Sequence, residues 1–433
     1  MSDTADVVVI GAGVIGGSIA LELCRTGRRV TVVDKGPAPG FGSTSASSAI
    51  IRFSYSTWEG VAIAWESKHR WAAWEDFLGY RDPAGMARFR QVGMAVLDVP
   101  LFSREKSKAL FDRAGIPYED WDEPTLRKRL PGVDTGSYFP PKPVGSEEFF
   151  AGPHGNLGAL YTPDAGYVDD PRLAAANLAA AAAARGAAFV FGRQVVALER
   201  AGGGWRIGLD DGTVLEAPAV VNAAGPWSGP LNTLAHADGD FAVNVRPMRQ
   251  EVHQVRAPGR LPADGAFPAI ADMDLGVYLR PEPGGHVLVG GLEPECDPLE
   301  WIDDPDAASP LPTASRFEAQ VLRAARRLPD LQVPNRPTGI AGVYDVSDDW
   351  IPIYDRTSVP GFYVAIGTSG NQFKNAPIVG SLLSAIISAT EGGHDHDADP
   401  VHFTCPATGL VVNLGAFSRR RERNPDSTGT VMG

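Results

Sequence analysis

The segment from Asp6 to Asp34 constrains the fold more than any other part of the sequence. DVVVI, a continuous β-branched run, predicts a parallel strand that is buried on both faces. GVIGGSIALELCRTG has the apolar spacing of a helix that ends at Gly27, and RVTVVD predicts a second buried strand. Strand, helix and strand at this length form one βαβ unit, so we predict a doubly wound α/β sheet of the Rossmann type.

Three glycines join the first strand to the helix. Gly11, Gly13 and Gly16 allow a tight turn, the approach of a pyrophosphate to the backbone, and close packing of the helix on the strand. The helix N-terminus adds free N–H groups and the positive end of the helix dipole. Asp34 ends the second strand, where its carboxylate can accept hydrogen bonds from ribose hydroxyls, and its charge argues against the 2′-phosphate of NADP. The same predicted dinucleotide site includes Val14, Ile15 and Lys35.

Two later motifs bear on the choice between NAD and FAD, because both cofactors fit this fingerprint. VVNAAGPWS ends a buried strand in the small residues Ala223, Ala224 and Gly225, as expected where a chain passes close to a bound dinucleotide. GTSGNQFKNAPIVG supplies a glycine-rich turn and then a helix, whose N-terminus can face an anionic group. Each motif taken alone is also compatible with an ordinary loop.

The α/β pattern occurs in three separated pieces, with β-rich pieces between them. This interleaving predicts two interdigitated domains. The dinucleotide-binding domain is expected to comprise residues 1–85, 158–238 and 336–400, and a substrate-binding domain rich in β-sheet to comprise 86–157 and 239–335. Residues 401–433 form a C-terminal extension. Its end, SRRRERNPDSTGTVMG, is polar and charged and is therefore predicted to be partly disordered.

The composition argues against several classes of protein. A net charge of -13, from 39 basic and 52 acidic residues, disfavours a nucleic-acid partner and a polybasic membrane anchor. Cys24, Cys296 and Cys405 form no disulfide framework and show no metal-ligand spacing, so we predict no metal site and a reducing compartment. The N-terminus lacks the features of a secretory signal, and the alanine-rich run is too short to span a bilayer. We therefore predict a cytoplasmic protein without a membrane span.

The segment GFGSTSASSAIIRFSYS, from Gly40 to Ser56, surrounds Arg52 with serine and threonine hydroxyls, which is unusual for a linker. This segment, VVVIGAGVIGGSIALEL, VVNAAG, AGVYDVSDDWIPI and GTSGNQFKNAPIVG occur in the order seen in D-amino-acid-oxidase-type flavoproteins. The chain resembles the sarcosine oxidase and dimethylglycine dehydrogenase branch of that family from residue 6 to about 390. The resemblance implies bound FAD and oxidation of a C–N bond.

The resemblance also implies roles for individual residues. Arg52 and Lys374 match an arginine and a lysine that bind the substrate carboxylate, and Tyr344 matches a tyrosine of the substrate pocket. A structural ion pair for Arg52, a solvated Lys374 and a core position for Tyr344 are the alternatives. The serine-rich segment is expected to wrap the flavin end of FAD. The implied FAD contacts are Ser43, Thr44, Ser45, Ser47, Ser48, Val195, Gly342, Gly370, Asn371, Gln372, Phe373 and Lys374.

Two positions depart from the family pattern. Gly342 replaces the cysteine that carries covalently attached flavin in some relatives, so we predict non-covalent FAD. Leu288 replaces a lysine that oxidases of the group place under the flavin, which favours a dehydrogenase over an oxidase. Three further polar residues on the strand-rich segment are predicted to be solvated: Arg249, His253 and His286.

The sequence thus predicts an FAD-dependent oxidoreductase that converts the C–N bond of an amino acid or N-alkyl amino acid to an imine, which water hydrolyses. The expected substrate is a small amine that bears a carboxylate, and the electrons pass to oxygen or to another acceptor. One alternative is a 2-hydroxy-acid oxidoreductase on the same fold. Another is a catalytically silent flavin-binding subunit of a larger dehydrogenase.

Overall fold

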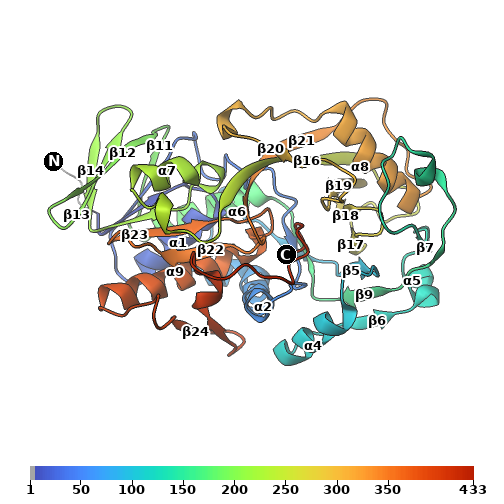
Figure 1. Ribbon diagram of the computed structural model, residues 1–433, viewed down its shortest axis with the longest axis horizontal. Coiled ribbons are helices and arrows are strands. Elements are labelled where there is room, and N and C mark those ends of the chain that lie inside the picture. The colour runs from blue at the N-terminus through green and yellow to red at the C-terminus, as the bar shows by residue number, and fades with distance from the viewer. Residues whose placement is uncertain (1–4) are drawn as a thin grey trace.

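Two sheets lie beside one another in the computed structural model, which describes residues 5–433 (Figure 1). The mixed α/β architecture predicted from the sequence is confirmed. The first sheet, at the left of Figure 1, has six strands, of which only the edge strand β22 is antiparallel to its neighbour. Its strands are, in order, β11 (Ala188–Phe191), β2 (Val30–Asp34), β1 (Val7–Ile10), β15 (Ala219–Asn222), β23 (Phe362–Ile366) and β22 (Ile353–Arg356).

The first sheet is covered on both faces, because successive residues of a strand point to opposite sides. Val7 and Val9 of β1 belong to one apolar cluster, and Val8 and Ile10 belong to another. The first cluster includes residues of the helices α1 (Val14–Arg25), α6 (Pro171–Ala183) and α9 (Ala376–Glu391). The second includes residues of α7 (Ser228–Leu234) and of an antiparallel sheet formed by β12 (Val195–Ala201), β13 (Gly204–Leu209) and β14 (Val214–Ala217).

The second sheet, at the right of Figure 1, has nine strands. Helix α8 (Ala314–Arg327) covers one face, where Phe317 and Val321 join an apolar cluster with Leu279. Tyr278 points to the opposite face and joins the cluster of the first sheet. The strands are β20 (Glu300–Trp301), β16 (Val245–Arg256), β19 (His286–Gly291), β18 (Val277–Glu282), β17 (Ala269–Asp272), β5 (Met94–Leu97), β9 (Ala159–Thr162) and β6 (Glu119–Trp121) in order, with β21 (Gly339–Ser347) paired to β16.

The other elements belong to neither of these two sheets. The longest of them is α2 (Trp58–Ala72). Thr57 caps its N-terminus, because the threonine hydroxyl accepts a hydrogen bond from the backbone N–H of Gly60. Among the helices of residues 5–433, none has the length and apolar character needed to cross a membrane. The remaining helices and strands are β3 (Ile50–Ile51), α3 (Trp74–Leu78), β4 (Phe89–Gln91), α4 (Arg104–Ala114), α5 (Glu123–Arg129), β7 (Gly136–Ser137), β8 (Gly155–Asn156), β10 (Gly166–Val168), β24 (His402–Thr404) and β25 (Val411–Asn413).

Sheet membership differs from the predicted domain ranges at two strands. β9 and β21 fall within 158–238 and 336–400, the ranges assigned to the FAD-binding domain, yet both pair in the nine-stranded sheet. Neither strand carries a sequence signal for its partner, because pairing depends on the neighbours that a strand meets in space. The division of the chain into two interleaved domains stays a prediction, and residues 1–4 of its first range lie outside the described residues.

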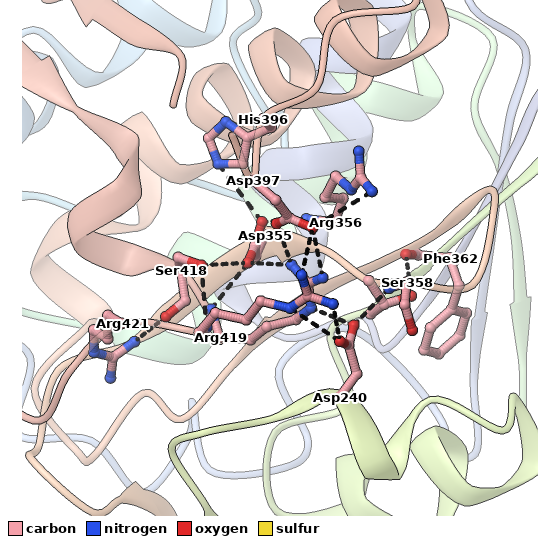
Figure 2. A network of polar contacts seen from close by, with 12 residues as sticks. Asp240, Asp355, Arg356, Ser358, Phe362, His396, Asp397, Ser418, Arg419 and Arg421 are labelled. Atoms are coloured by element: carbon pink, nitrogen blue, oxygen red, sulfur yellow. Dashed lines mark hydrogen bonds and ion pairs between the residues drawn. The ribbon is translucent and has the colours of Figure 1, made fainter. Parts of the chain in front are cut away.

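The C-terminal segment differs from the predicted partly disordered extension, because it packs against both halves of the molecule. Arg419 is fully buried, and its guanidinium forms ion pairs with Asp240, Asp355 and Asp397 (Figure 2). The Nη1 group of Arg419 lies 2.9 Å from Asp355 and 2.7 Å from Asp397. Three carboxylates from separate segments thus compensate the buried charge, which a polar composition alone does not reveal. Farther on, Met432 is buried. The C-terminal end of the chain lies near the centre of the molecule in Figure 1.

Candidate active site

A cavity of about 1260 Å³ follows the carboxyl ends of the parallel strands of the first sheet. Its lining includes Gly11 after β1, Asp34 at the end of β2, Ala223 after β15 and Ala365 of β23. In open α/β sheets this edge is the usual place for a nucleotide. The volume exceeds the roughly 300–1,000 Å³ of an ordinary ligand pocket, which suits a long dinucleotide.

The glycine-rich turn has the close contacts that a dinucleotide cradle requires. Gly11 has a φ of +110°, and a Cβ atom at this residue would lie 2.3 Å from the carbonyl oxygen of Ala223. The Oδ2 atom of Asp34 accepts a hydrogen bond from the backbone N–H of Ala12 at 2.6 Å, so the carboxylate is fixed beside the turn. Thr44 Oγ1 accepts from the N–H of Val14 at 3.1 Å, which brings the serine-rich segment to the start of α1. These residues fit the adenosine and pyrophosphate parts of FAD.

Most of the predicted cofactor residues lie along this cavity, and six do not. Gly16 packs under the turn, where a Cβ atom would meet the carbonyl oxygen of Gly11, and Gly342 lies against Ala46. Ser45 donates to the carbonyl of Gly42 instead. Ser48, Asn371 and Lys374 line a second, smaller pocket. The predicted residues that line the large cavity are Gly11, Gly13, Val14, Ile15, Asp34, Lys35, Ser43, Thr44, Ser47, Val195, Ala223, Ala224, Gly225, Gly370, Gln372 and Phe373.

The smaller pocket, of about 50 Å³, adjoins the large cavity. Ser47, Tyr344, Gly370 and Phe373 line both, so they form the junction between the two. The ring of Tyr344 occupies the space where Gly370 lacks a side chain, because a Cβ atom there would lie 2.3 Å from the ring. Tyr344 is therefore a pocket residue, as its predicted role requires. Burial raises the pKa of its hydroxyl well above the ordinary value, so the hydroxyl stays protonated and can donate.

Arg52 and Lys374 both reach the smaller pocket and are both buried, with 5% and 3% of their surface exposed. Arg52 lies over the ring of Tyr55, and Lys374 donates to the hydroxyl of the same tyrosine at 3.0 Å. Neither cation forms an ion pair with an Asp or Glu anywhere in residues 5–433, so Arg52 is not part of a structural ion pair and Lys374 is not solvated. Burial, followed by the charge of Arg52, lowers the pKa of Lys374 well below its ordinary value.

The C-terminal segment reaches this pair of cations. The carbonyl oxygen of Val431 accepts a hydrogen bond from Nη2 of Arg52 at 2.6 Å, and Met432 also lines the pocket. The backbone N–H of Val431 donates to Oε2 of Glu293, a carboxyl group in the loop after β19. A backbone segment therefore occupies the place where the sequence predicts the substrate carboxylate.

The prediction that Arg249 and His253 are solvated is wrong, because both are buried, at 4% and 0% exposure. They lie with Glu251 on the face of β16 that packs against α8, away from the pocket. Ion pairs with Glu251 and Glu300 compensate the buried charge of Arg249. His286 is only partly buried. Leu288 is also partly buried, and it lines neither cavity.

Sequence reasoning missed four residues at or beside the smaller pocket: Tyr55, Tyr278, Arg280 and Glu293. Tyr278 bonds the hydroxyl of Ser48 at 2.6 Å, and Arg280 donates to the carbonyl of Ser48 at 3.1 Å. Their alternate spacing in GVYLRP places both on one strand face. The sequence does not show which face that is, because strand partners lie far apart in the chain.

A doubly wound sheet with a dinucleotide cavity that meets a buried cationic pocket defines a dinucleotide-dependent oxidoreductase. The chain belongs to the DAO family of FAD-dependent oxidoreductases, whose family model matches residues 6–386. The predicted family and its cofactor FAD are thereby confirmed.

Individual relatives cover nearly the whole chain at low identity. A glycine oxidase of Geobacillus kaustophilus is 26% identical over 91% of this chain and 96% of its own length. A glycerol 3-phosphate dehydrogenase of Caloramator mitchellensis is 26% identical over 88% of this chain and 73% of its own. The crystal structure of L-proline dehydrogenase from P. horikoshii superposes with a TM-score of 0.74 at 20% identity, over 97% of this chain and 98% of that one, which shows the shared fold.

Proposed function

We propose that this protein oxidises the C–N bond of a small amine that carries a carboxylate, with an amino acid or N-alkyl amino acid as the substrate. Arg52 binds the carboxylate through the planar fork of its guanidinium, and Lys374 adds a second positive charge. Tyr344 lies at the junction of the two cavities, so in this proposal its ring separates the substrate from the cofactor. When bound, FAD accepts the two electrons of the C–H bond next to nitrogen.

The observation that carries this proposal is the pair of buried cations without an acidic partner. An uncompensated buried charge costs on the order of 3–5 kcal/mol, so a protein retains one where a ligand compensates it. Arg52 and Lys374 meet at the small pocket, next to the large cavity in which we expect FAD to bind. An anionic group of the substrate is the partner that both cations lack. The same argument disfavours a catalytically silent flavin-binding subunit, because such a subunit binds no substrate anion that could compensate the two buried cations.

Oxidation of a 2-hydroxy acid is the second candidate, because the same cations can hold its carboxylate. The reaction products distinguish oxidation of an amine from oxidation of a 2-hydroxy acid. An amine substrate yields ammonia, a primary amine or an aldehyde, whereas a hydroxy acid yields a keto acid alone.

The direct test is anaerobic bleaching of the purified flavoprotein by a panel of small molecules. The panel contains N-methyl and plain amino acids, their 2-hydroxy-acid counterparts, and the matching amines without the carboxylate. We expect at least one amino acid to bleach the flavin, and its decarboxylated amine to be much slower. Bleaching by hydroxy acids alone supports the second candidate. An alkylamine that reduces the flavin as fast as the matching amino acid contradicts the carboxylate assignment.

A further inference from the structure

The backbone of Val431 is held at both ends inside the candidate substrate pocket. Its carbonyl oxygen accepts from Nη2 of Arg52 at 2.6 Å, and its N–H donates to Oε2 of Glu293 at 2.9 Å. Within one residue, nitrogen and oxygen are joined through N–Cα–C–O, as the amino nitrogen and a carboxylate oxygen are joined in an α-amino acid. Arg52 and Glu293 therefore stand at the separation that such a molecule spans.

Glu293 is poorly explained as a structural residue. It has a φ of +47°, a conformation that is uncommon for a side chain of this size. Its Oε1 atom accepts from the side-chain amide of Gln250 at 2.9 Å, which fixes the direction of the carboxyl group. No Lys, Arg or His of the described chain lies within ion-pair distance of it, although Arg249, Arg323 and Arg327 of the same domain each have acidic partners.

The pocket is thus polarised along the line from Arg52 to Glu293. Two cations, Arg52 and Lys374, line the pocket, and the carboxyl group of Glu293 lies beside it, bonded to the N–H of the lining residue Val431. Burial raises the pKa of Glu293 to about 8, although the hydrogen bond from Val431 and the charge of Arg316 lower it. A cation that replaced the Val431 N–H would favour the ionised carboxylate. An α-amino acid carries the complementary charges, a carboxylate and an ammonium group.

We propose that Glu293 binds the amino group of the substrate while Arg52 binds its carboxylate, so that the pocket selects α-amino acids over carboxylic acids and 2-hydroxy acids. This assignment rests on the proposed function, which it deepens by naming the residue that recognises nitrogen. A hydroxyl group can donate to Glu293 but brings no charge, so it gains less from the carboxylate. The substrate must displace the backbone of Val431, since both use the same two side chains.

The test compares the dissociation constants of N-methylglycine and acetate for the FAD-loaded wild type and for Glu293→Gln. Acetate binding is followed by the change in the flavin spectrum. N-methylglycine binding is followed in the same way or, where it bleaches the flavin, by the concentration dependence of anaerobic bleaching. Glutamine keeps the size of the side chain and removes its charge. Glu295→Gln, at an exposed residue two positions on, is the matched control.

We expect the wild type to prefer N-methylglycine to acetate, and Glu293→Gln to lose at least about tenfold of N-methylglycine affinity with acetate changed less than twofold. Glu293→Asp, which keeps the charge, should restore part of the preference even if the glutamine variant folds poorly. Equal weakening of both ligands, or a wild type without the preference, overturns the assignment of Glu293. Failure of every amino acid in the bleaching panel is a separate outcome, which rejects the proposed function itself.

Discussion

The ammonium group of Lys374 donates a hydrogen bond to the hydroxyl of Tyr55 at 3.0 Å, inside a pocket that also contains the guanidinium of Arg52. Tyr55 is itself buried, and burial raises its pKa to about 12, so it offers Lys374 a neutral oxygen. Lys374 also donates to the carbonyl oxygen of Asn371. Two neutral acceptors do not compensate the burial of an ammonium group, which explains why the pKa of Lys374 is lowered.

Binding of a carboxylate should therefore be coupled to proton uptake by Lys374. The anion favours the charged form, so the pKa of Lys374 rises on binding, and protons enter at any pH between the lowered value and the ordinary one near 10.4. Calorimetric titration with acetate in two buffers of different ionisation enthalpy measures this uptake. Lys374→Met removes the titrating group and should abolish it, while Tyr55, Tyr344 and Arg52 stay in place. Equal uptake by wild type and variant contradicts the assignment.

The same lowered pKa predicts how stability without ligand depends on pH. The unfolded chain keeps the Lys374 proton up to about pH 10.4, whereas the folded chain releases it at the lowered value. Between these values the unfolded state binds more protons, so this group makes the free energy of unfolding rise with pH. Denaturant unfolding at several pH values measures the slope. Lys374→Met should flatten the slope, and a variant with an unchanged slope contradicts the prediction.

Arg52→Ala should weaken acetate binding by roughly 10–150-fold, the value of about 1.5–3 kcal/mol for hydrogen bonds to a charged group. The variant also loses the contact with Val431, but that partner is a neutral carbonyl and offsets only part of the loss. A spectral titration of the bound flavin gives the dissociation constant. Arg206→Ala, on an exposed face of β13, is the control and should bind acetate as the wild type does. An Arg52 variant with unchanged affinity excludes the carboxylate role.

Some residues of this site could be predicted from the sequence, because their roles depend only on local backbone geometry. The turn at Gly11 and the terminal carboxylate of Asp34 depend on backbone geometry within one βαβ unit, and both line the large cavity. Arg52 and Lys374 could be named from their motifs, but their isolation from acidic residues is a property of the whole fold. Glu293 has no motif around it. Its role can be inferred only from the folded structure, where the loop after β19 meets β16 and the C-terminal segment.

The C-terminal segment shows the limit of arguments from composition. SRRRERNPDSTGTVMG is polar enough to predict disorder. Yet Arg419 and Arg421 find carboxylates on distant elements, including Asp355 and Asp349, and the segment becomes part of the pocket wall. Charged residues that the sequence predicts to be solvated form ion pairs in the fold, and their partners cannot be identified from the neighbouring residues in the sequence.

FAD should be released intact when the protein is denatured. The resemblance predicts that Gly342 stands at the position of the linking cysteine of some relatives, and a Cβ atom there would already lie 2.6 Å from Cβ of Ala46. None of the three cysteines lines either cavity. Acid precipitation should therefore give a colourless pellet and a yellow supernatant. A pellet that stays yellow after washing shows a covalent bond.

Removal of residues 428–433 should strengthen the binding of small carboxylates. The carbonyl oxygen of Val431 accepts a hydrogen bond from Arg52, so acetate must displace this oxygen to bind the guanidinium. A chain that ends at Ser427 has no such competing group. We expect the dissociation constant of acetate to fall by about tenfold, the value of about 1.4 kcal/mol for one hydrogen bond. The shortened protein keeps the Arg419 ion pairs, and its melting temperature checks that the fold is intact. An unchanged or weaker affinity in a folded variant shows that the segment does not compete.

Positive charge beside the flavin bears on the choice of electron acceptor. The reaction of a reduced flavoenzyme with oxygen is accelerated by positive charge near the place where superoxide develops. The resemblance to sarcosine oxidases predicts that Leu288 stands where those enzymes carry a lysine under the flavin, and Leu288 pairs with Arg280 in the neighbouring strand. Arg280 lies 2% exposed, with one guanidinium nitrogen 3.3 Å from Glu282 and another bonded to the carbonyl of Ser48. Its charge is thus engaged by an acid and a backbone carbonyl, and an apolar Leu288 supplies none.

We therefore expect slow reaction with oxygen and fast turnover with an artificial dye. In stopped-flow mixing of substrate-reduced enzyme with air-saturated buffer, reoxidation should take minutes. Leu288→Lys should accelerate it, provided that the new ammonium stays protonated, whereas Leu288→Met should leave it slow. Reoxidation of the wild type within seconds, with stoichiometric hydrogen peroxide, shows an oxidase. In that case Arg280→Met tests the source of charge, because loss of the fast reaction in this variant assigns it to Arg280 and its persistence excludes Arg280.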